Sequence, residues 1–191
     1  MKNHLKIIYT LFATLTILYS CKTTKSLEKV NGAVSITVPF SEGKYKSDNN
    51  YFRAKQTGNS PDLATAKKIA LINAKTELGG IVSSTIKSVT DQYTNQRTVG
   101  NSQELEIKFE ELAREVVNVS LADVRIMDVK VFKEINNIFT FWIVIEMPKE
   151  SVLKSMSNKI SKDKKLKLDY DKMKFEQIFN SEMEKLSNEQ N

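Results

Sequence analysis

Two residue types that carry much of enzyme chemistry are almost missing from this chain of 191 residues. The single histidine is His4 and the single cysteine is Cys21. The sequence after residue 21 therefore holds no imidazole and no thiol. This excludes Ser-His-Asp and Cys-His catalysis there, and also zinc sites built from His or Cys. An intrachain disulfide is excluded as well, so the folded part must gain its stability from core burial.

The remaining catalytic options are a carboxylate pair and a Ser-Lys dyad. Most carboxylates fall in a charged helical pattern that a solvated helix face explains, and they include Glu104, Glu106, Glu110, Glu111 and Glu115. Ser151 and Lys154 are three residues apart on an expected helix, where both are ordinary surface residues. Gly79-Gly80 lacks the surrounding G-x-x-x-x-G-K pattern of a phosphate-binding loop. We therefore predict a protein without catalytic residues, cofactor or metal site.

Cys21 stands at the end of a segment with the pattern of an export signal. Positive side chains precede Ile7, and an apolar run of about 12 residues follows up to Leu18, too short to span a hydrocarbon core of roughly 30 Å. The sequence Leu18-Tyr19-Ser20-Cys21 resembles a bacterial lipobox, from which only Tyr19 departs. The resemblance implies cleavage before Cys21 and a lipid on its thiol. The alternatives are a cleaved secretory signal with an incidental cysteine and an uncleaved anchor.

The charge of the mature chain is mildly basic. Of the 29 Lys and Arg side chains, 27 follow residue 20, against 23 Asp and Glu, which leaves +4. Nucleic-acid binding usually needs clustered positive charge, so we predict no nucleic-acid partner. Residues 21–31 are polar and predict a tether. We expect a lipid-anchored protein of the cell envelope, in the outer membrane. Because Lys22 follows the cysteine and no acidic run comes after it, an anchor that faces the periplasm is favoured over display on the cell surface.

The first half of the domain is expected to alternate strands and a helix. Residues 33–38 alternate apolar and small polar side chains and predict a strand that Pro39 ends. Residues 41–60 are polar and predict a loop. A helix is expected from Ser60 to Leu78, stopped by Gly79-Gly80. Residues 81–99 are rich in β-branched side chains and predict one long strand.

The expected helix carries a stripe of small side chains. Ala66, Ala70 and Ala74 recur every four residues, and Leu63 and Leu78 extend the stripe at both ends. Small side chains on one face let a helix approach a sheet closely, so the stripe indicates core packing. A second helix is expected after Asn101, with Glu104 completing a capping box. Its buried stripe is Leu105, Phe109, Leu112 and Val116.

Residues 119–134 and 138–147 predict a β-hairpin about Asn136-Asn137. In the expected register Val131 faces Trp142 and Phe132 faces Phe141. The second strand, FTFWIVIEM, is apolar on both faces, so it is central in its sheet or covered by the C-terminal tail or another protomer. We predict an interaction face on one side of this strand, formed by Phe139, Phe141, Ile143 and Ile145.

The C-terminal tail is expected to be helical. A first stripe consists of Val152, Met156 and Ile160. A basic run at 162–168 is read as a solvated joint between two helices. A second stripe is too apolar to remain in water and must bury against the domain or a partner; it consists of Phe175, Ile178, Phe179, Met183 and Leu186.

The chain resembles the lipoprotein-20 family of small bacterial membrane-anchored lipoproteins over about residues 33–148. The resemblance lies in Tyr51-Phe52-Arg53-Ala54, the turn at 58–60, the alanine-spaced helix, and the strand pair that ends at Pro148. It implies an α+β domain with a helix on an antiparallel sheet, membrane association, and no enzymatic activity. It carries over no catalytic residue.

These observations predict an α+β fold in which two helices pack on an antiparallel β-sheet, with a C-terminal helical extension. The expected parts are a signal peptide at 1–20, a lipidated tether at 21–31, a domain at 32–148 and a tail at 149–191. The expected function is that of a structural or protein-interaction lipoprotein, whose partners are the membrane, through the lipid, and an envelope protein or a second copy. The alternative is a binding module for an envelope glycan or lipid.

The lipid anchor gives a direct test. Cys21→Ser removes the thiol that the lipid needs, so the protein should leave the membrane fraction, because one remaining apolar segment of this length does not anchor a protein stably. Fractionation of cells followed by a high-salt wash measures this. Retention of the variant in the washed membranes would show that the lipid is not what holds the protein.

Overall fold

The computed structural model describes residues 29–30, 33–34, 36–95, 102–163 and 171–189. The chain divides into two units, residues 1–37 and residues 38–191. In the first unit, strands β1 (Lys29–Val30) and β2 (Ala33–Val34) pair antiparallel. The strand predicted at 33–38 is therefore confined to its first two residues. Ile36 and Val38 are exposed, so no apolar face is buried there to hold a longer strand.

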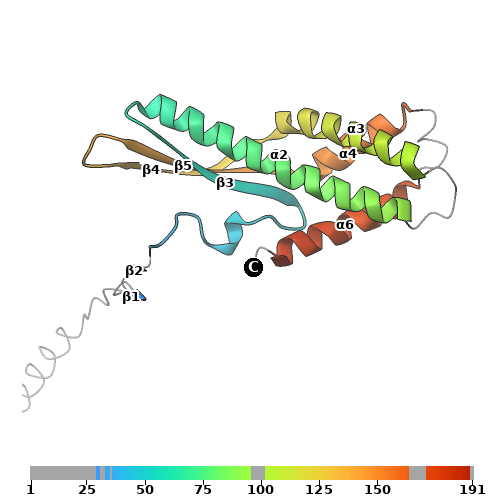
Figure 1. Ribbon diagram of the computed structural model, residues 1–191, viewed down its shortest axis with the longest axis horizontal. Helices are drawn as coiled ribbons and strands as arrows, with labels where there is room; N and C mark the ends of the chain where they lie inside the picture. Colours follow the sequence, from blue (N-terminus) through green and yellow to red (C-terminus); the bar gives the residue numbers. More distant parts are fainter. Residues whose placement is uncertain (1–28, 31–32, 35, 96–101, 164–170, 190–191) are drawn as a thin grey trace, which may run out of the picture. The chain divides into compact units, whose positions relative to one another are not determined.

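The second unit holds a three-stranded antiparallel sheet and four long helices, which confirms the α+β fold (Figure 1). The strand order is β3 (Tyr51–Ser60), β5 (Phe139–Pro148), β4 (Arg125–Lys133). The helices are α2 (Leu63–Asn95), α3 (Ser102–Ser120), α4 (Lys149–Ile160) and α6 (Lys172–Glu189). The described part of this unit also contains two short 3₁₀ helices, η2 (Gly43–Tyr45) and η3 (Leu121–Asp123).

Strand β3 occupies half of the segment that was predicted as a loop. Its residues pair with β5 from Tyr51 opposite Pro148 to Ser60 opposite Phe139. Lys55, Gln56, Gly58 and Asn59 have weak strand propensity, which explains the wrong prediction. Burial decides the outcome, because Phe52 and Ala54 alternate into the core and β5 supplies a full ladder of partners.

Helix α2 is far longer than predicted. It begins at Leu63, where the Asp62 carboxylate accepts a hydrogen bond from the Thr65 N–H at 2.7 Å. It passes through Gly79-Gly80 and ends at Asn95, so both the predicted stop and the predicted strand at 81–99 are wrong. The buried alanine stripe continues at helical spacing through Val82, Ile86, Val89 and Tyr93. Burial of that continuous stripe outweighs the weak helix propensity of the β-branched residues.

The alanine stripe does what its spacing predicted, since Ala66, Ala70 and Ala74 are fully buried. Leu63 lies outside the stripe and is exposed. The closest approach between α2 and β3 occurs at Gly58, where an added Cβ would overlap the Ala66 carbonyl oxygen and the Ala70 amide nitrogen. Gly58 therefore lets the backbones of helix and strand touch.

The β4–β5 hairpin exists, but its register differs by one residue from the predicted one. Val131 faces Phe141 and Lys130 faces Trp142. The loop is longer than a two-residue turn, because the Glu134 N–H donates to the Ile138 carbonyl and Asn137 adopts a left-handed conformation with φ 62°. An irregularity between Ile126 and Asp128 leaves Met127 as an extra residue, a β-bulge.

Strand β5 is central in the sheet, as its two apolar faces predicted. One face packs on α2 through Phe141, Ile143 and Ile145. The other face carries Val144, which packs with Phe40 and Tyr45. The C-terminal tail, one of the two covers named in advance, contributes at one end of the sheet, where the Phe52 ring of β3 meets the Phe179 ring of α6 at 6.3 Å between centroids. Helix α2 and the segment just before β3 cover the two faces.

The C-terminal helices belong to the same compact unit as the sheet. The stripe of α4 is fully buried, as predicted, and so are Phe175, Phe179 and Met183 of α6. Helix α6 lies along the second half of α2 (Figure 1). The Tyr93 ring of α2 meets the Phe109 ring at 6.2 Å and the Phe175 ring at 5.6 Å between centroids. A second core thus forms beyond the sheet.

Two expectations for these helices concern residues outside the described part. They are the helix cap at Asn101 and the basic run from residue 164 onward. The stripe of α3 is buried at Phe109, Leu112 and Val116, which confirms those three positions.

The contact at Gly58 predicts that adding one methyl group there lowers stability much more than adding one at another glycine. Gly58→Ala should lower the free energy of unfolding by about 2 kcal/mol or more, because helix and strand must separate to admit the Cβ. Gly43→Ala is the matched control, since no atom lies within 4 Å of a Cβ there, and it should change stability by less than about 0.5 kcal/mol. Urea unfolding of both variants measures the difference; equal stability would refute the tight contact.

Candidate interaction surface

Strand β4 exposes apolar side chains along its whole length. Exposed fractions are between 42 and 48% for Ile126, Val129, Val131 and Phe132. Helix α2 contacts β3 and β5 and reaches β4 little, so the side chains of β4 are left uncovered. Within the described part of the chain, no strand pairs with the outer side of β4. We call this strand, Arg125–Lys133, the β4 edge.

The two faces of the β4 edge differ in chemistry. Val129 and Val131 pair with Ile143 and Phe141 of β5. Their side chains therefore lie on the face of the sheet that α2 covers at β5 and β3. Asp128 and Lys130 lie on the opposite face, beside Phe40 and Tyr45. The Tyr45 hydroxyl donates to Asp128 Oδ2 at 2.6 Å, and Lys130 Nζ lies 4.8 Å from the centre of the Phe40 ring.

The pKa of the Asp128 carboxyl is lowered from its ordinary value. The Tyr45 hydroxyl is the largest cause, and the Val129 N–H follows. Val129 N–H donates to Asp128 Oδ1 at 2.8 Å, so this amide points away from β5 and toward the outer side of the strand. Asp128 is therefore an anion that caps one outward amide of the β4 edge.

The opposite edge of the sheet is closed by its own side chains. The Ser47 hydroxyl accepts from the Arg53 N–H and donates to the Arg53 carbonyl, at 2.9 and 3.2 Å. Farther along β3, Asn73 of α2 donates its side-chain amide to the Thr57 carbonyl at 3.0 Å. These bonds occupy backbone groups that a further strand would need, so β3 is a poor site for strand addition.

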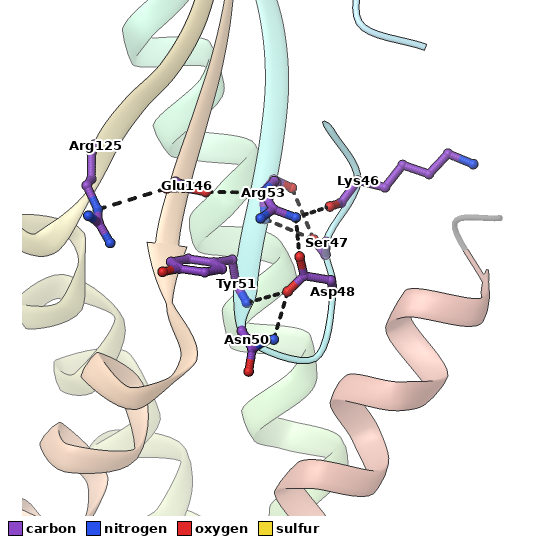
Figure 2. Close-up of polar contacts among 8 residues, drawn as sticks. All are labelled: Lys46, Ser47, Asp48, Asn50, Tyr51, Arg53, Arg125 and Glu146. Carbon is purple, nitrogen blue, oxygen red and sulfur yellow. Dashed lines mark hydrogen bonds and ion pairs between the residues drawn. The ribbon is translucent and has the colours of Figure 1, made fainter. Parts of the chain in front are cut away.

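Arg53 holds the segment before β3 against the sheet (Figure 2). Its guanidinium donates to Asp48 at 2.5 Å, to Glu146 at 3.2 Å and to the Lys46 carbonyl at 2.7 Å. The Arg53 side chain is only 10% exposed. An arginine at this position could bind an anion or form a structural ion pair. Because its donors are engaged within the chain, the geometry favours the structural role.

The face predicted for interaction is part of the core. Phe141, Ile143 and Ile145 are buried against α2, and Phe139 packs at the margin of the same cluster. The prediction is wrong because α2 lies directly on this face of β5. Cys21, the predicted lipidation site, lies outside the described residues.

The β4 edge was missed, although the sequence contained a signal for it. RIMDVKVFK carries apolar residues on both faces, as its partner strand does. Once β5 takes the central position, both of its neighbours lie at edges of the three-stranded sheet. Only the placement of α2 decides that β4 is the uncovered neighbour.

A separate cleft of about 460 Å³ lies between α2 and α3. Phe109 and Ala113 line it, together with the charged side chains Lys87, Asp91, Glu110 and Arg114. In each helix one cation and one anion are four residues apart, a spacing typical of solvated helix faces. The cleft is a second candidate for binding.

Features that would point to metal or membrane-spanning functions were sought in the described residues. No group of three His, Cys, Asp or Glu side chains there could hold a metal ion. No helix among the same residues is long and apolar enough to cross a membrane. Neither a model of a known protein family nor a curated protein sequence matches the chain.

The Arg53 cluster predicts a pH-dependent contribution from Asp48. Partial burial by itself would raise the pKa of this carboxyl. The Asn50 and Tyr51 N–H groups and the Arg53 guanidinium outweigh burial, so the pKa is lowered below its ordinary 3.8. A carboxyl with a lowered folded-state pKa contributes stability above its unfolded-state pKa and loses it as the pH falls through the folded value.

Asp48→Asn should therefore be less stable than the wild type at pH 7, and the difference should shrink below pH 3.8. Urea unfolding of both proteins from pH 7 to pH 2.5 or so measures this. A difference that stays constant, or grows toward acid pH, would contradict the proposed role of the carboxylate.

Proposed function

We propose that this chain is a lipid-anchored lipoprotein of the bacterial cell envelope, a member of the lipoprotein-20 family, which acts without catalysis as a structural or protein-interaction module. The lipid on Cys21 would hold it in the outer membrane, facing the periplasm. The β4 edge is the site of contact in this proposal and replaces the buried face of β5.

The exposed β4 edge is the observation that carries the proposal. A long edge strand with apolar side chains and unpaired backbone groups is a template for pairing with another chain. At the other edge of the same sheet, Ser47 and Asn73 bind backbone groups of β3. An exposed edge is therefore not a general feature of this fold. A strand added at β4 would bury Val129, Val131 and Phe132.

The arrangement of charged groups supports a role by contact. Several partly buried charges serve the fold. Arg53 binds Asp48 and Glu146, and Glu182 of α6 accepts from Ser88 and Gln92 of α2 at 2.5 and 2.6 Å. These groups are held by neighbours within the chain. We therefore propose no reaction for them.

A binding module for an envelope glycan or lipid is the second candidate. The cleft between α2 and α3 favours it, since an aromatic ring and charges of both signs line one hollow. It ranks second because the charges there follow the ordinary spacing of exposed helix faces, whereas the β4 edge breaks the ordinary rule that long apolar edges are covered.

Photo-cross-linking in intact cells tests the proposed function. A photoreactive phenylalanine analogue at Phe132, which is 48% exposed on β4, should form adducts with an envelope protein or a second copy. The same analogue at Ile107, 53% exposed on α3, is the matched control and should form few. Mass spectrometry identifies the adducts. Equal, unspecific labelling at both positions would remove the support for an interaction site at β4.

A further inference from the structure

We propose that the partner of the β4 edge is the β4 edge of a second copy, paired antiparallel about a two-fold axis at Val129. This inference rests on the proposed function in one respect, because it takes the β4 edge as the contact site. It adds the identity of the partner and the register of the pairing.

The sequence of β4 is self-complementary about Val129. Antiparallel pairing on that axis places Asp128 opposite the Lys130 of the second copy, and Lys130 opposite its Asp128. The next position pairs Met127 with Val131, both apolar and both exposed. Opposite charges and apolar side chains facing each other across strands both stabilise a pair.

Other registers lose this match. An axis at Val131 would place Asp128 opposite Glu134 and Val129 opposite Lys133. Like charges directly opposite each other destabilise strand pairing. The charge pattern therefore favours a two-fold axis at Val129 over one at Val131, the next residue on the same face of the strand.

The backbone at Val129 has the orientation that this pairing needs. Its N–H points to the outer side of β4, where Asp128 Oδ1 now accepts it at 2.8 Å. In the pair, each Val129 N–H would donate to the Val129 carbonyl of the other copy, as in a hydrogen-bonded antiparallel pair. Asp128 Oδ1 would then be released to accept from the facing Lys130, while Oδ2 keeps the Tyr45 hydroxyl.

The two-fold axis places the helices of both copies on the same side of one continuous sheet. The Val129 and Val131 side chains of both copies then form one apolar strip between the two α2 helices. The β-bulge at Met127 and the like charges of Arg125 and Lys133 confine the regular ladder to the central residues. The pairing is therefore short and depends strongly on the central charge pairs.

Disulfide trapping tests the register in the full chain, in its own membrane. A lipid on Cys21 leaves the wild type without a free thiol, so an introduced cysteine reacts alone. Val129→Cys lies on the axis, where opposite Cα atoms are roughly 5.5 Å apart, within disulfide range. Mild oxidation should shift most of this variant to a dimer on a non-reducing gel.

Val131→Cys is the matched control, because it has almost the same exposure and shares the same face. Its two copies would lie four residues apart along the ladder, roughly 13 Å, too far for a disulfide. Equal cross-linking of both variants would indicate random collision and overturn the proposal. Failure of Val129→Cys to cross-link would overturn it as well.

Charge exchange tests the pairing without relying on geometry. In the Val129→Cys background, Asp128→Lys alone sets Lys against Lys, and Lys130→Asp alone sets Asp against Asp. Each should lower the cross-linked fraction roughly tenfold. Co-expressed with tags of different size, the two variants face each other with opposite charges, and the mixed dimer should return. Misfolding cannot explain recovery in the mixture, so its absence would overturn the charge-paired register.

The outcomes separate this inference from the function on which it rests. If Phe132 forms adducts with a different protein and Val129→Cys does not cross-link, the interaction site is retained and self-pairing is refuted. A disulfide dimer of the wild type would show a free thiol at Cys21 and refute the anchor. The trapping experiment is then decided in the Cys21→Ser background.

Discussion

The close contact between α2 and β3 at Gly58 is the constraint on which the rest of this fold depends. Only a residue without a side chain lets the strand backbone reach the helix backbone at Ala66 and Ala70. That contact fixes the height and the lateral position of α2 over the sheet. Because α2 lies over β3 and β5, it buries the odd-numbered residues of β5 and reaches little of β4. The exposed edge is thus a consequence of where the helix is seated.

The same helix also explains why the C-terminal segment folds back. Helix α2 is 33 residues long, roughly 50 Å, and its second half passes beyond the core of the sheet. The stripe from Val82 to Tyr93 would be exposed there without cover. Helices α3 and α6 provide it, and the Asp171 N–H donates to the Tyr93 hydroxyl at 2.7 Å where α6 begins. One long apolar stripe therefore joins a sheet core to a helical core.

The sequence predicted those features that depend on a single periodic pattern. The buried alanines, the stripe of α4, most of that of α6, and the central place of β5 all follow from side-chain spacing, and the structure confirms them. The failures share one cause. Residues 81–95 have strand-like composition and 51–60 have loop-like composition, yet tertiary burial makes the first helical and pairs the second with β5. The register of the hairpin also escaped prediction, since a longer loop with Asn137 in a left-handed conformation shifts it by one residue. The contact site was placed on β5 instead of β4 because the position of α2 over the sheet was not predicted.

The outer face of the sheet links the segment before β3 to the exposed edge. Arg53 ties residues 46–48 to β3, and Phe40 and Tyr45 pack on Val144 of the central strand. From that position Tyr45 reaches across to Asp128, and Phe40 lies beneath the Lys130 ammonium group. The two charged side chains of the β4 edge are therefore oriented by Phe40 and Tyr45 of the segment just before β3. Displacing that segment would free Asp128 and Lys130 together and expose Val144. Phe40, Tyr45, Asp128 and Lys130 thus form one packed layer on the outer face of the sheet, and the geometry of the edge depends on that layer.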